Sequence, residues 1–384
     1  MIDARHRVVV TGCGTVSAIA TTAPAFWEAL LAGRSGIGRI PRLVAAQLPV
    51  TTGGEVTAVP PDRADRDVAL ANQAIDEALD AAHLHRDGAA FIWATGLDTY
   101  QQGEQGPVFR PSGSCFAALS RPFREPRRMI AAACAAGTQA IGEAYWNIRA
   151  GRIAACVAGG SSCLLSPFYI MGFAALQALA TDDGGDPCTA CRPFDRRRRG
   201  FALSDGAAAL VLESLEAARR RGAPVLAEVV GFGMSQDGFD LNRPPEDGRG
   251  AVRCLHRAVE DAGLAPSDVD AVNAHATGTL VGDRAEAAAI RRFFGSDWKR
   301  KAVSSLKGAI GHAMAAAGAL EAVAAVATCR TGLVPPTVNL HDPDEDCELR
   351  HVIGRPHEDD VRTVVSTSFG MGGQNAAVVF RRFP

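Results

Sequence analysis

Short runs of apolar, often β-branched residues alternate with helix-like stretches along most of this chain, and this alternation limits the folds it can adopt. Val8–Val10 predicts a strand that stops at the glycine turn Thr11–Gly14, and a helical stretch follows around Phe26–Leu31. Because such alternation favours sheets covered by helices, we expect a layered α/β architecture with mostly parallel strands. Further strands are predicted at Ala89–Ala94, Met129–Ala133, Ala154–Gly159, Phe201–Leu212, Ala227–Gly231, Thr363–Ser368 and Ala376–Phe380, and further helices at Val68–Ala82, Ala135–Arg149, Ala251–Ala262, Asp283–Phe294 and Ala315–Cys329.

Two segments of the chain share a strand-then-helix pattern in outline. The first surrounds Cys134, and the second, Ala302–Cys329, leads through Lys307 and His312 into an alanine-rich helix. Two related halves would place both helix starts at one central face, so we expect the reactive residues of both segments to meet there. By contrast, Gly96–Arg128 is rich in Gly, Pro, Gln, Ser and Arg without a sustained period, and we predict a loop or lid.

Charge and composition exclude several classes of protein. The formal net charge is -2, whereas proteins that bind nucleic acid usually carry a basic excess that meets the phosphates. The chain shows no secretory signal pattern, and no uncharged apolar run approaches the ~20 residues that span a bilayer. Ten cysteines in 384 residues are too few for a disulfide scaffold. We therefore expect a cytoplasmic protein with neither nucleic acid nor a membrane as partner.

Two short motifs carry little weight as cofactor or metal sites. A dinucleotide fingerprint would follow Gly12 and Gly14 with a third glycine, but that position holds Ser17. Cys188-x-x-Cys191 has the spacing of half a zinc knuckle and has no second pair. Neither motif predicts a bound cofactor or metal.

Cys134 is the candidate nucleophile. It lies among alanines and before Gly137 at a predicted strand-to-helix junction, where small neighbours would let a substrate approach closely. A helix N-terminus stabilises a thiolate, so this position is expected to lower the pKa of the thiol. The alternative is a buried structural cysteine, which behaves as a small apolar side chain.

Two histidines lie in similar settings of small residues. His275 is followed by Ala276, and His312 follows Gly311, each after a β-rich segment. Cysteine with histidine is the minimal pairing for activated nucleophilic catalysis. The two histidines could also share a metal, but they are far apart in the chain and form no compact ligand pattern, so no metal is expected.

Four ordered motifs together resemble the β-ketoacyl-acyl-carrier-protein synthases of the synthase II type. They are Ala133–Thr138, His275–Thr279, Lys307–His312 and Ser368–Asn375. The resemblance implies the thiolase fold, a five-layered α-β-α-β-α core made of two related halves, here residues 1–225 with Cys134 and residues 226–384 with both histidines and the glycine-rich loop. Val8–Gly12, Arg192–Asp195 and Asp205–Ala207 also resemble that family, so the likeness covers essentially the whole chain.

The resemblance also implies catalytic roles. Cys134 would take an acyl group from a carrier-protein phosphopantetheine. His275 and His312 would promote decarboxylation of a malonyl thioester and stabilise the enolate that extends the chain. The backbone N–H groups of Cys134 and Met371 would form the second oxyanion hole. This chemistry needs no resident cofactor, because the phosphopantetheine belongs to the acyl carrier protein, which is itself the expected partner.

Supporting roles follow from the same match. Lys307 would pair with Glu321 and orient the His312 region, and the alternative is an ion pair that only holds the fold. Thr277 and Thr279 would hydrogen-bond the pantetheine arm, where the alternative is ordinary turn chemistry. Phe369 and Met371, in the final glycine loop, are expected to contact substrate.

Several departures from the family bear on the substrate. The stretch between Ile40 and Cys134 is shorter than in the fatty-acid enzymes, and Phe116–Ile130, which in the family lines the acyl tunnel and contributes to the dimer contact, is compressed and rich in Arg and Pro. Met371 stands where relatives have a gating phenylalanine, and Ala276 replaces a glycine. These differences favour a specialised type II polyketide or polyene pathway.

Three alternatives remain open at this stage. The reaction could belong to ordinary fatty-acid elongation, the chain could be a non-catalytic partner like the chain-length factors, or it could be a malonyl thioester decarboxylase that does not condense. Chain-length factors usually lack the nucleophile, so Cys134 argues against the second. A homodimer and a heterodimer with a related subunit are both compatible with the sequence. Surface arginines around Arg124, Arg127, Arg128 and Arg196–Arg199 are candidate contacts for an acidic carrier protein.

Overall fold

The computed structural model describes residues 7–97, 100–103, 106–111, 113–181 and 184–384. Its helices are α1 (Ala23–Leu31), α2 (Pro41–Ala45), α3 (Arg66–Ala82), α4 (Ser114–Ser120), α5 (Ala136–Arg149), α6 (Pro167–Ala175), α7 (Leu215–Arg220), α8 (Arg249–Asp261), α9 (Leu280–Phe294), α10 (Lys307–Ile310) and α11 (Ala317–Thr331). Its strands are β1 (Val8–Val16), β2 (Ile37–Arg39), β3 (Thr52–Gly54), β4 (Ala90–Ala94), β5 (Tyr100–Gly103), β6 (Gly106–Phe109), β7 (Arg124–Ile130), β8 (Ala155–Ser162), β9 (Gly206–Ser214), β10 (Ala227–Gln236), β11 (Ala271–Asn273), β12 (Ala302–Ser304), β13 (Leu333–Val334), β14 (Arg350–His351), β15 (His357–Glu358), β16 (Thr363–Gly370) and β17 (Gln374–Arg381).

The main sheet contains the same five-strand pattern twice. Its order is β14-β12-β11-β16-β17-β10-β1-β9-β8-β4-β7. One set contains β1, β4, β7, β8 and β9, and the other contains β10, β11, β12, β16 and β17. If the strands of each set are numbered in chain order, both sets read third, second, fourth, fifth, first from the outer end of the set to the middle of the sheet. In both sets the second strand is parallel to its two neighbours and the fifth is antiparallel. The two sets join where β1 pairs antiparallel with β10.

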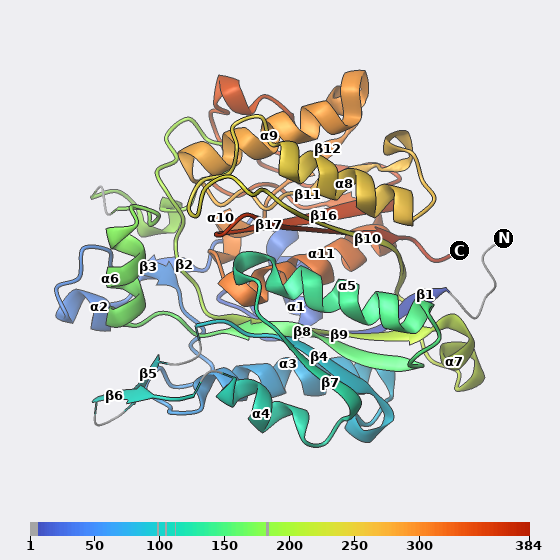
Figure 1. The fold of residues 1–384 in the computed structure, drawn as a ribbon. Helices are drawn as coiled ribbons and strands as arrows, with labels where there is room; N and C mark the ends of the chain where they lie inside the picture. The colour runs from blue at the N-terminus through green and yellow to red at the C-terminus, as the bar shows by residue number, and fades with distance from the viewer. Residues whose placement is uncertain (1–6, 98–99, 104–105, 112, 182–183) are drawn as a thin grey trace.

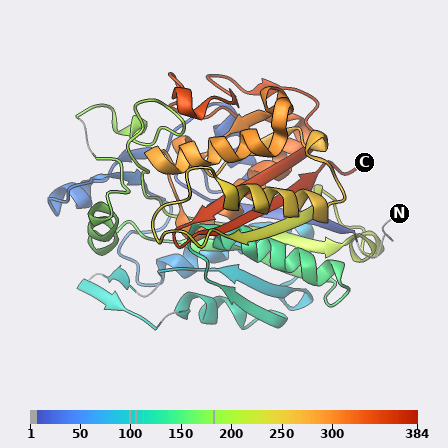
Figure 2. The same cartoon turned by 45° about the horizontal axis from the view of Figure 1, so that its top comes forward.

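Helices divide the structure into five layers. Figure 1 shows α5 and α11 between the two halves of the sheet, with α3 and α4 beyond one half and α8 and α9 beyond the other. Figure 2, with the top brought forward, shows the same outer helices, α8 and α9, lying across their half of the sheet. The predicted α-β-α-β-α architecture of two related halves is therefore confirmed. None of the described helices is both long and apolar enough to cross a bilayer.

The two middle helices approach closely through glycines. An ideal Cβ on Gly318 of α11 would lie 2.2 Å from Oγ1 and 2.7 Å from the backbone nitrogen of Thr138 in α5. On the other side, a Cβ on Gly137 would lie 2.8 Å from the carbonyl oxygen of Ala315. Since these distances are shorter than real carbon contacts, both positions need glycine. One glycine lies in α5 and the other in α11, as expected for two related halves.

Replacing Gly318 with alanine will destabilise the protein by about 1–3 kcal/mol, because the added methyl group forces α5 and α11 apart in a packed interior. The measurement is the midpoint of urea unfolding. Gly172→Ala is the matched control, since Gly172 lies in α6 with no other atom within 4 Å of its ideal Cβ. The control should be neutral or slightly more stable, because alanine favours helix. Equal midpoints for the two variants would contradict the close helix contact.

The prediction of a loop or lid over Gly96–Arg128 is wrong in part. Residues 98–99, 104–105 and 112 lie outside the described residues; around them the structure places β5, β6, α4 and most of β7. β7 is the last strand of the main sheet and, among the described strands, pairs only with β4, so most of its side chains are exposed. Exposed edge strands do not need apolar alternation, and the arginines of β7 therefore hid it from a pattern-based prediction. β7 also ends at Ile130, so the strand predicted at Met129–Ala133 begins and ends too late.

One other predicted strand is shorter than expected. Phe201–Leu212 was predicted as continuous, but β9 begins at Gly206. The residues before it make isolated bridges instead, Phe201 with Leu179 and Leu203 with His312. This irregular segment therefore runs beside one of the candidate catalytic histidines.

Candidate active site

Cys134 lies in a short 3-10 turn, Ala133–Ala135, that leads directly into α5. Ala133 before it has φ of +48°, a left-handed conformation that is uncommon for a residue with a side chain. Met314 repeats this conformation, with φ of +46°, in the corresponding turn before α11. The side chain of Cys134 is buried, as expected for either a nucleophile or a structural cysteine, so its neighbours decide its role.

His312 is the closest of these neighbours. It follows α10 and Gly311, which has φ of +76°. Its N–H donates to the carbonyl of Ala202 at 2.7 Å, and its carbonyl accepts from the N–H of Ser204 at 3.1 Å. With its backbone held on both sides, the ring places Nε2 3.1 Å from Sγ of Cys134. The ring also meets Phe201 edge to face, with centroids 5.1 Å apart.

His275 approaches from the other side of the same site. It follows β11, and its N–H donates to the carboxylate of Glu286 at 2.9 Å, while the N–H of Ala276 donates to the other oxygen at 2.6 Å. The rings of His275 and His312 are nearly perpendicular, with centroids 5.4 Å apart. The structure therefore brings both predicted histidines to the candidate nucleophile.

The three side chains also form a set that could hold a metal. Their ligand atoms all lie within 4.8 Å of one another. The expectation of no metal rested in part on the separation of the histidines along the chain, and that ground fails because the segment after β11 brings His275 beside His312. The residue types are those that hold Zn²⁺ in sites with three protein ligands and an open fourth position.

Lys307 and Glu321 form an ion pair beneath this site, with both side chains fully buried. They come from α10 and α11, so the pair links the turn before His312 to the central helix. Burial, and then the positive charge of Lys307, lower the pKa of His275 and of His312 well below the usual value. Both imidazoles are therefore neutral at physiological pH.

The pKa of Cys134 differs from the sequence-based expectation. Burial raises the pKa of its thiol to about 11, although the charge of Lys307 and the backbone N–H groups of Met371 and Cys134 oppose this rise. The expected lowering by the start of α5 is therefore outweighed by desolvation. At neutral pH Cys134 is a thiol and needs a base.

Alkylation of Cys134 by iodoacetamide will therefore accelerate steadily with pH. Because the pKa of the thiol is raised to about 11, the thiolate fraction should increase about tenfold per pH unit through the neutral range. The measurement is the modified fraction of the peptide containing Cys134, by mass spectrometry, over a pH series. A plateau close to neutrality would show that His312 already holds the proton and would contradict this expectation.

A cavity of about 490 Å³ leads to the three side chains. Thr277 and Thr279 line it, and their hydroxyl oxygens lie 3.1 Å apart. Phe369 and Met371 line it as well, and the ring of Phe369 lies 5.8 Å from that of His275. The structure thus places all the predicted substrate-contact residues on one cavity with Cys134, whereas Lys307 and Glu321 lie behind it.

Sequence analysis missed the residues that hold the threonine loop. The N–H groups of Gly278 and Phe194 donate to the two carboxylate oxygens of Asp283, at 3.0 and 2.8 Å. Arg198 is buried against Asp283 and donates to Asp344 at 2.7 Å. Both carboxylates lie in the predicted helix Asp283–Phe294, and no sequence signal separates them from the exposed acidic residues of an amphipathic helix.

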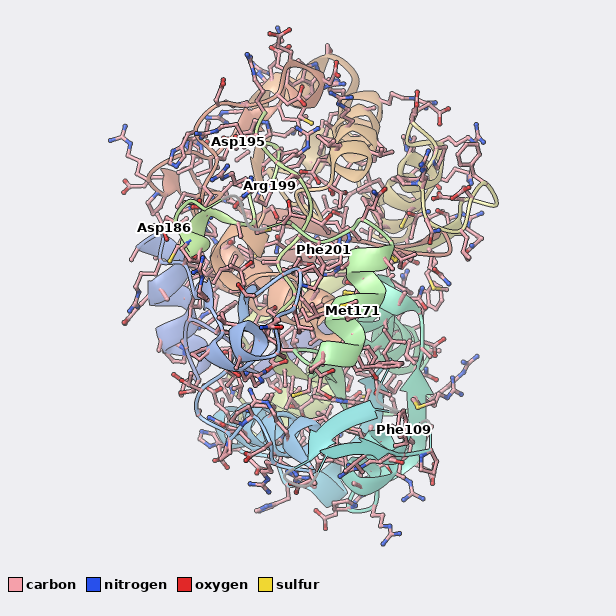
Figure 3. The ribbon with its side chains drawn as sticks, turned by 90° about the vertical axis from the view of Figure 1, so that its left-hand side faces the viewer. Phe109, Met171, Asp186, Asp195, Arg199 and Phe201 are labelled. Atoms are coloured by element: carbon pink, nitrogen blue, oxygen red, sulfur yellow. The ribbon has the colours of Figure 1, made fainter. Side chains whose placement is uncertain are left out.

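The burial of Arg198 corrects one expectation about surface arginines. Arg196–Arg199 was treated as a possible contact for an acidic partner, but Arg198 is buried, while Arg196 and Arg197 are exposed and already paired with acidic side chains. Arg199 lines the cavity. In Figure 3 Arg199 and Phe201 lie one after the other along the segment that crosses this side of the molecule.

Comparison with known families agrees with this arrangement across both halves of the chain. The family pattern described as "Beta-ketoacyl synthase, N-terminal domain" matches residues 5–218, and "Beta-ketoacyl synthase, C-terminal domain" matches residues 226–341. The chain belongs to the β-ketoacyl synthase family. It is therefore an enzyme, a condensing acyltransferase of the ketosynthase kind, and its likeness to relatives named 3-oxoacyl-[acyl-carrier-protein] synthase 2 makes it one of the synthase II type.

Curated relatives match this ketosynthase over nearly its full length. The "3-oxoacyl-[acyl-carrier-protein] synthase 2" of Coxiella burnetii is 36% identical, with 98% of this chain and 99% of the relative covered. The "3-oxoacyl-[acyl-carrier-protein] synthase I, chloroplastic" of Hordeum vulgare is 34% identical, with 99% and 90% covered. The first alignment runs over 410 positions, more than the 384 residues of this chain, so the ketosynthase is shortened relative to that enzyme.

Solved structures give the same fold. One is described as a type II PKS acyl-carrier protein in complex with its ketosynthase bound to the hexaketide; a chain of it has a TM-score of 0.90 at 28% identity, with 98% of this chain and 99% of that chain covered. Another, "The ishigamide ketosynthase/chain length factor", has a TM-score of 0.87 at 32% identity, with 99% and 100% covered. Both confirm the predicted thiolase-type fold for this ketosynthase.

Proposed function

We propose that this ketosynthase catalyses decarboxylative Claisen condensation of an acyl-cysteine with a malonyl thioester carried by an acyl carrier protein, in a specialised type II polyketide or polyene pathway. The single observation that carries the proposal is the placement of Cys134 3.1 Å from Nε2 of His312, with His275 in the same cluster, at the end of a cavity of about 490 Å³. Cys134, His275 and His312 are the proposed catalytic residues.

In the first half-reaction Cys134 attacks the thioester carbonyl of the acyl donor. Nε2 of His312 is the base within reach of the thiol proton. The backbone N–H groups of Cys134 and Met371 lower the pKa of this thiol and would stabilise the oxyanion. The carbonyl then re-forms, the bond to the pantetheine sulfur breaks, and that sulfur leaves as a thiol with the proton. The acyl group is left on Cys134.

In the second half-reaction the malonyl thioester loses carbon dioxide. Because burial keeps the pKa of His275 and of His312 low, both rings are neutral and can each donate an N–H to the developing enolate oxygen. The Nδ1 atoms of these rings have no hydrogen-bond partner among the described residues, so neither ring is fixed in one tautomer. The enolate carbon attacks the acyl carbonyl, the carbon–sulfur bond breaks, and the thiolate of Cys134 takes up a proton.

Residues around this cluster have proposed supporting roles. Thr277 and Thr279 would hydrogen-bond the pantetheine arm, since both hydroxyls line the cavity. Phe369 and Met371 would contact the acyl chain, with Met371 packed against the apolar cluster that includes Cys134. An unbranched thioether adapts to shape more readily than a planar ring, which supports a substrate unlike a plain fatty acyl chain.

The proposed residue assignments extend to the rest of the chain. Residues 1–225 would form the half that carries the nucleophile and residues 226–384 the half that carries the histidines, a division that falls between α7 and β10. The reaction as written needs no resident cofactor or metal. The proposed partner is an acyl carrier protein, together with either a second copy or a related ketosynthase-like subunit, as in the ketosynthase/chain length factor pair named above.

Intact-protein mass after incubation with acyl carrier-protein thioesters tests the proposal. The donor panel contains short, medium, polyunsaturated and aromatic acyl groups, followed by malonyl carrier protein. We expect a stable mass gain from at least one polyunsaturated or aromatic donor, and an extended carrier-bound product after malonyl addition. Preference for saturated medium chains would favour fatty-acid elongation instead. No acylation from any donor would favour a non-catalytic partner subunit.

A further inference from the structure

The resting catalytic cluster has the composition of a soft-metal site. It offers one thiol and two imidazoles, the ligands that Zn²⁺ prefers, with all three ligand atoms within 4.8 Å of one another. Tetrahedral Zn²⁺ needs sulfur and nitrogen ligands ~3.6 Å apart, given bonds of ~2.3 and ~2.0 Å. Nε2 of His312 and Sγ of Cys134 are 3.1 Å apart and all three ligand atoms lie within 4.8 Å, so movements of up to about one ångström would admit the ion.

We propose that Cys134, His275 and His312 bind Zn²⁺ or a similar soft divalent cation reversibly, and that this ion and an acyl group exclude one another on Cys134. The exclusion of acylation rests on the proposed function, whereas metal binding itself does not. Binding converts the thiol to a metal-bound thiolate and releases one proton to solvent, with no change of oxidation state. The metal-bound enzyme has no free nucleophile.

The backbone around the cluster favours such a site, because each ligand comes from a separately held segment. Two N–H groups bond Glu286 around His275, two backbone hydrogen bonds hold His312, and Cys134 precedes α5 directly. Ligands fixed in this way lose little conformational entropy when an ion binds.

Two opposite charges beside the cluster act on an entering cation. Lys307 lies nearest as a positive charge, but its ammonium is paired with the carboxylate of Glu321, and both are fully buried. Glu321 therefore offsets Lys307 in part, but the charge of Lys307 still disfavours positive charge at both histidines and limits the affinity for a dication. The negative thiolate formed on binding adds a further favourable interaction.

The cavity provides a route and the fourth ligand. It connects the cluster to the surface, and its wall near the cluster includes Thr277 and Phe369. A water molecule entering through the cavity would complete a four-coordinate site with three protein ligands. An acyl group on Cys134 removes the thiolate and occupies the same space.

The surroundings also limit the affinity. Zinc-bound histidines usually donate their second ring nitrogen to a carboxylate or carbonyl, which strengthens binding about 10- to 100-fold. Nδ1 of His275 and Nδ1 of His312 are buried without such a partner in the described part of the chain. The site is therefore expected to exchange its ion rather than to retain it as a permanent cofactor.

Spectroscopic titration of the full-length enzyme with Co²⁺ tests the proposal without measuring activity. We expect one Co²⁺ per chain, with a near-ultraviolet thiolate-to-cobalt charge-transfer band that Zn²⁺ displaces. The band should be lost in Cys134→Ser and in enzyme alkylated by iodoacetamide, and should be greatly weakened in His312→Asn. Cys188→Ser with Cys191→Ser is the matched control, because that pair is the other thiol motif of the chain, and the control should bind as the unmodified enzyme does.

Three outcomes would overturn the proposal. A band that survives in Cys134→Ser, or that disappears in the Cys188 and Cys191 variant, would place the metal elsewhere. Saturating Co²⁺ without a charge-transfer band would show that the cluster does not bind soft metals. An enzyme that binds Co²⁺ through Cys134 but accepts no acyl group would support the metal site while contradicting the proposed function, so the two failures can be told apart.

Discussion

Replacing Cys134 with alanine will abolish acyl transfer to the protein and lower condensation by at least ~10³-fold, since no other described group could form the thioester. Among the residues that the structure describes, Cys134 is the only cysteine on the cavity with both histidines. The measurements are intact mass after incubation with the best donor and the yield of extended carrier-bound product. Cys188→Ala is the matched control, because Cys188 is half-exposed and away from the cavity wall, and it should retain both activities.

A Cys134→Gln variant separates the two half-reactions. Its side chain cannot be acylated, but His275 and His312 remain to stabilise the enolate, so decarboxylation of malonyl carrier protein should persist or rise while chain extension is lost. If the unmodified enzyme releases carbon dioxide at the same rate with and without an acyl donor, and never forms an extended product, the protein is a decarboxylase. A full acyl mass gain in Cys134→Ala would refute the assignment of the nucleophile.

Much of the catalytic cluster could be predicted because the local sequence around each member identifies it. Cys134 lies at a strand-to-helix junction among small residues, and both histidines lie beside glycine or alanine after β-rich segments. Such junctions fall at the ends of strands, where an α/β fold collects reactive groups. The internal repeat then explains why segments some 140–180 residues apart meet. His312 and Cys134, for example, are 178 residues apart in the chain and are in direct contact.

The support of the cluster could not be predicted in the same way. Glu286 holds the backbone of His275, and Asp283 holds Gly278, yet in the sequence both look like surface residues of an amphipathic helix. Their role depends on which face of α9 meets the segment after β11, and that is decided by packing. Burial likewise raises the pKa of Cys134, whereas the start of a helix was expected to lower it. The helix start can be read from local sequence, but desolvation depends on neighbours from every layer of the fold.

Removing one member of the buried ion pair will have the largest effect on stability. Lys307→Met leaves the carboxylate of Glu321 buried without its partner, which typically costs about 3–5 kcal/mol. Lys307→Met combined with Glu321→Leu should recover most of that loss, since an apolar pair of similar volume is often as stable as a buried ion pair. The measurement is urea unfolding of both variants beside the unmodified enzyme. A double variant no more stable than the single one would contradict this reasoning.

The loss of folding stability in Lys307→Met should grow as the pH rises. Burial raises the pKa of Glu321 and Lys307 opposes that rise, so losing Lys307 raises the pKa of Glu321 further. A carboxyl whose pKa is higher in the folded than in the unfolded state binds a proton on folding, so its contribution to stability is retained at low pH and lost as the pH rises above the unfolded value of about 4.3. The stability of the variant should therefore come closest to that of the unmodified enzyme at acidic pH.

The double variant separates a structural from a catalytic role for the pair. The charge of Lys307 lowers the pKa of His275 and His312, so its removal raises the pKa of both rings. If neutral imidazoles are required, decarboxylation increases as pH rises through these pKa values, and the acid limb of its pH profile should shift to higher pH in the stable double variant. An unchanged acid limb would leave Lys307 and Glu321 with only the task of joining α10 to α11, whereas a shift would make Lys307 a positioning residue that keeps both histidines neutral.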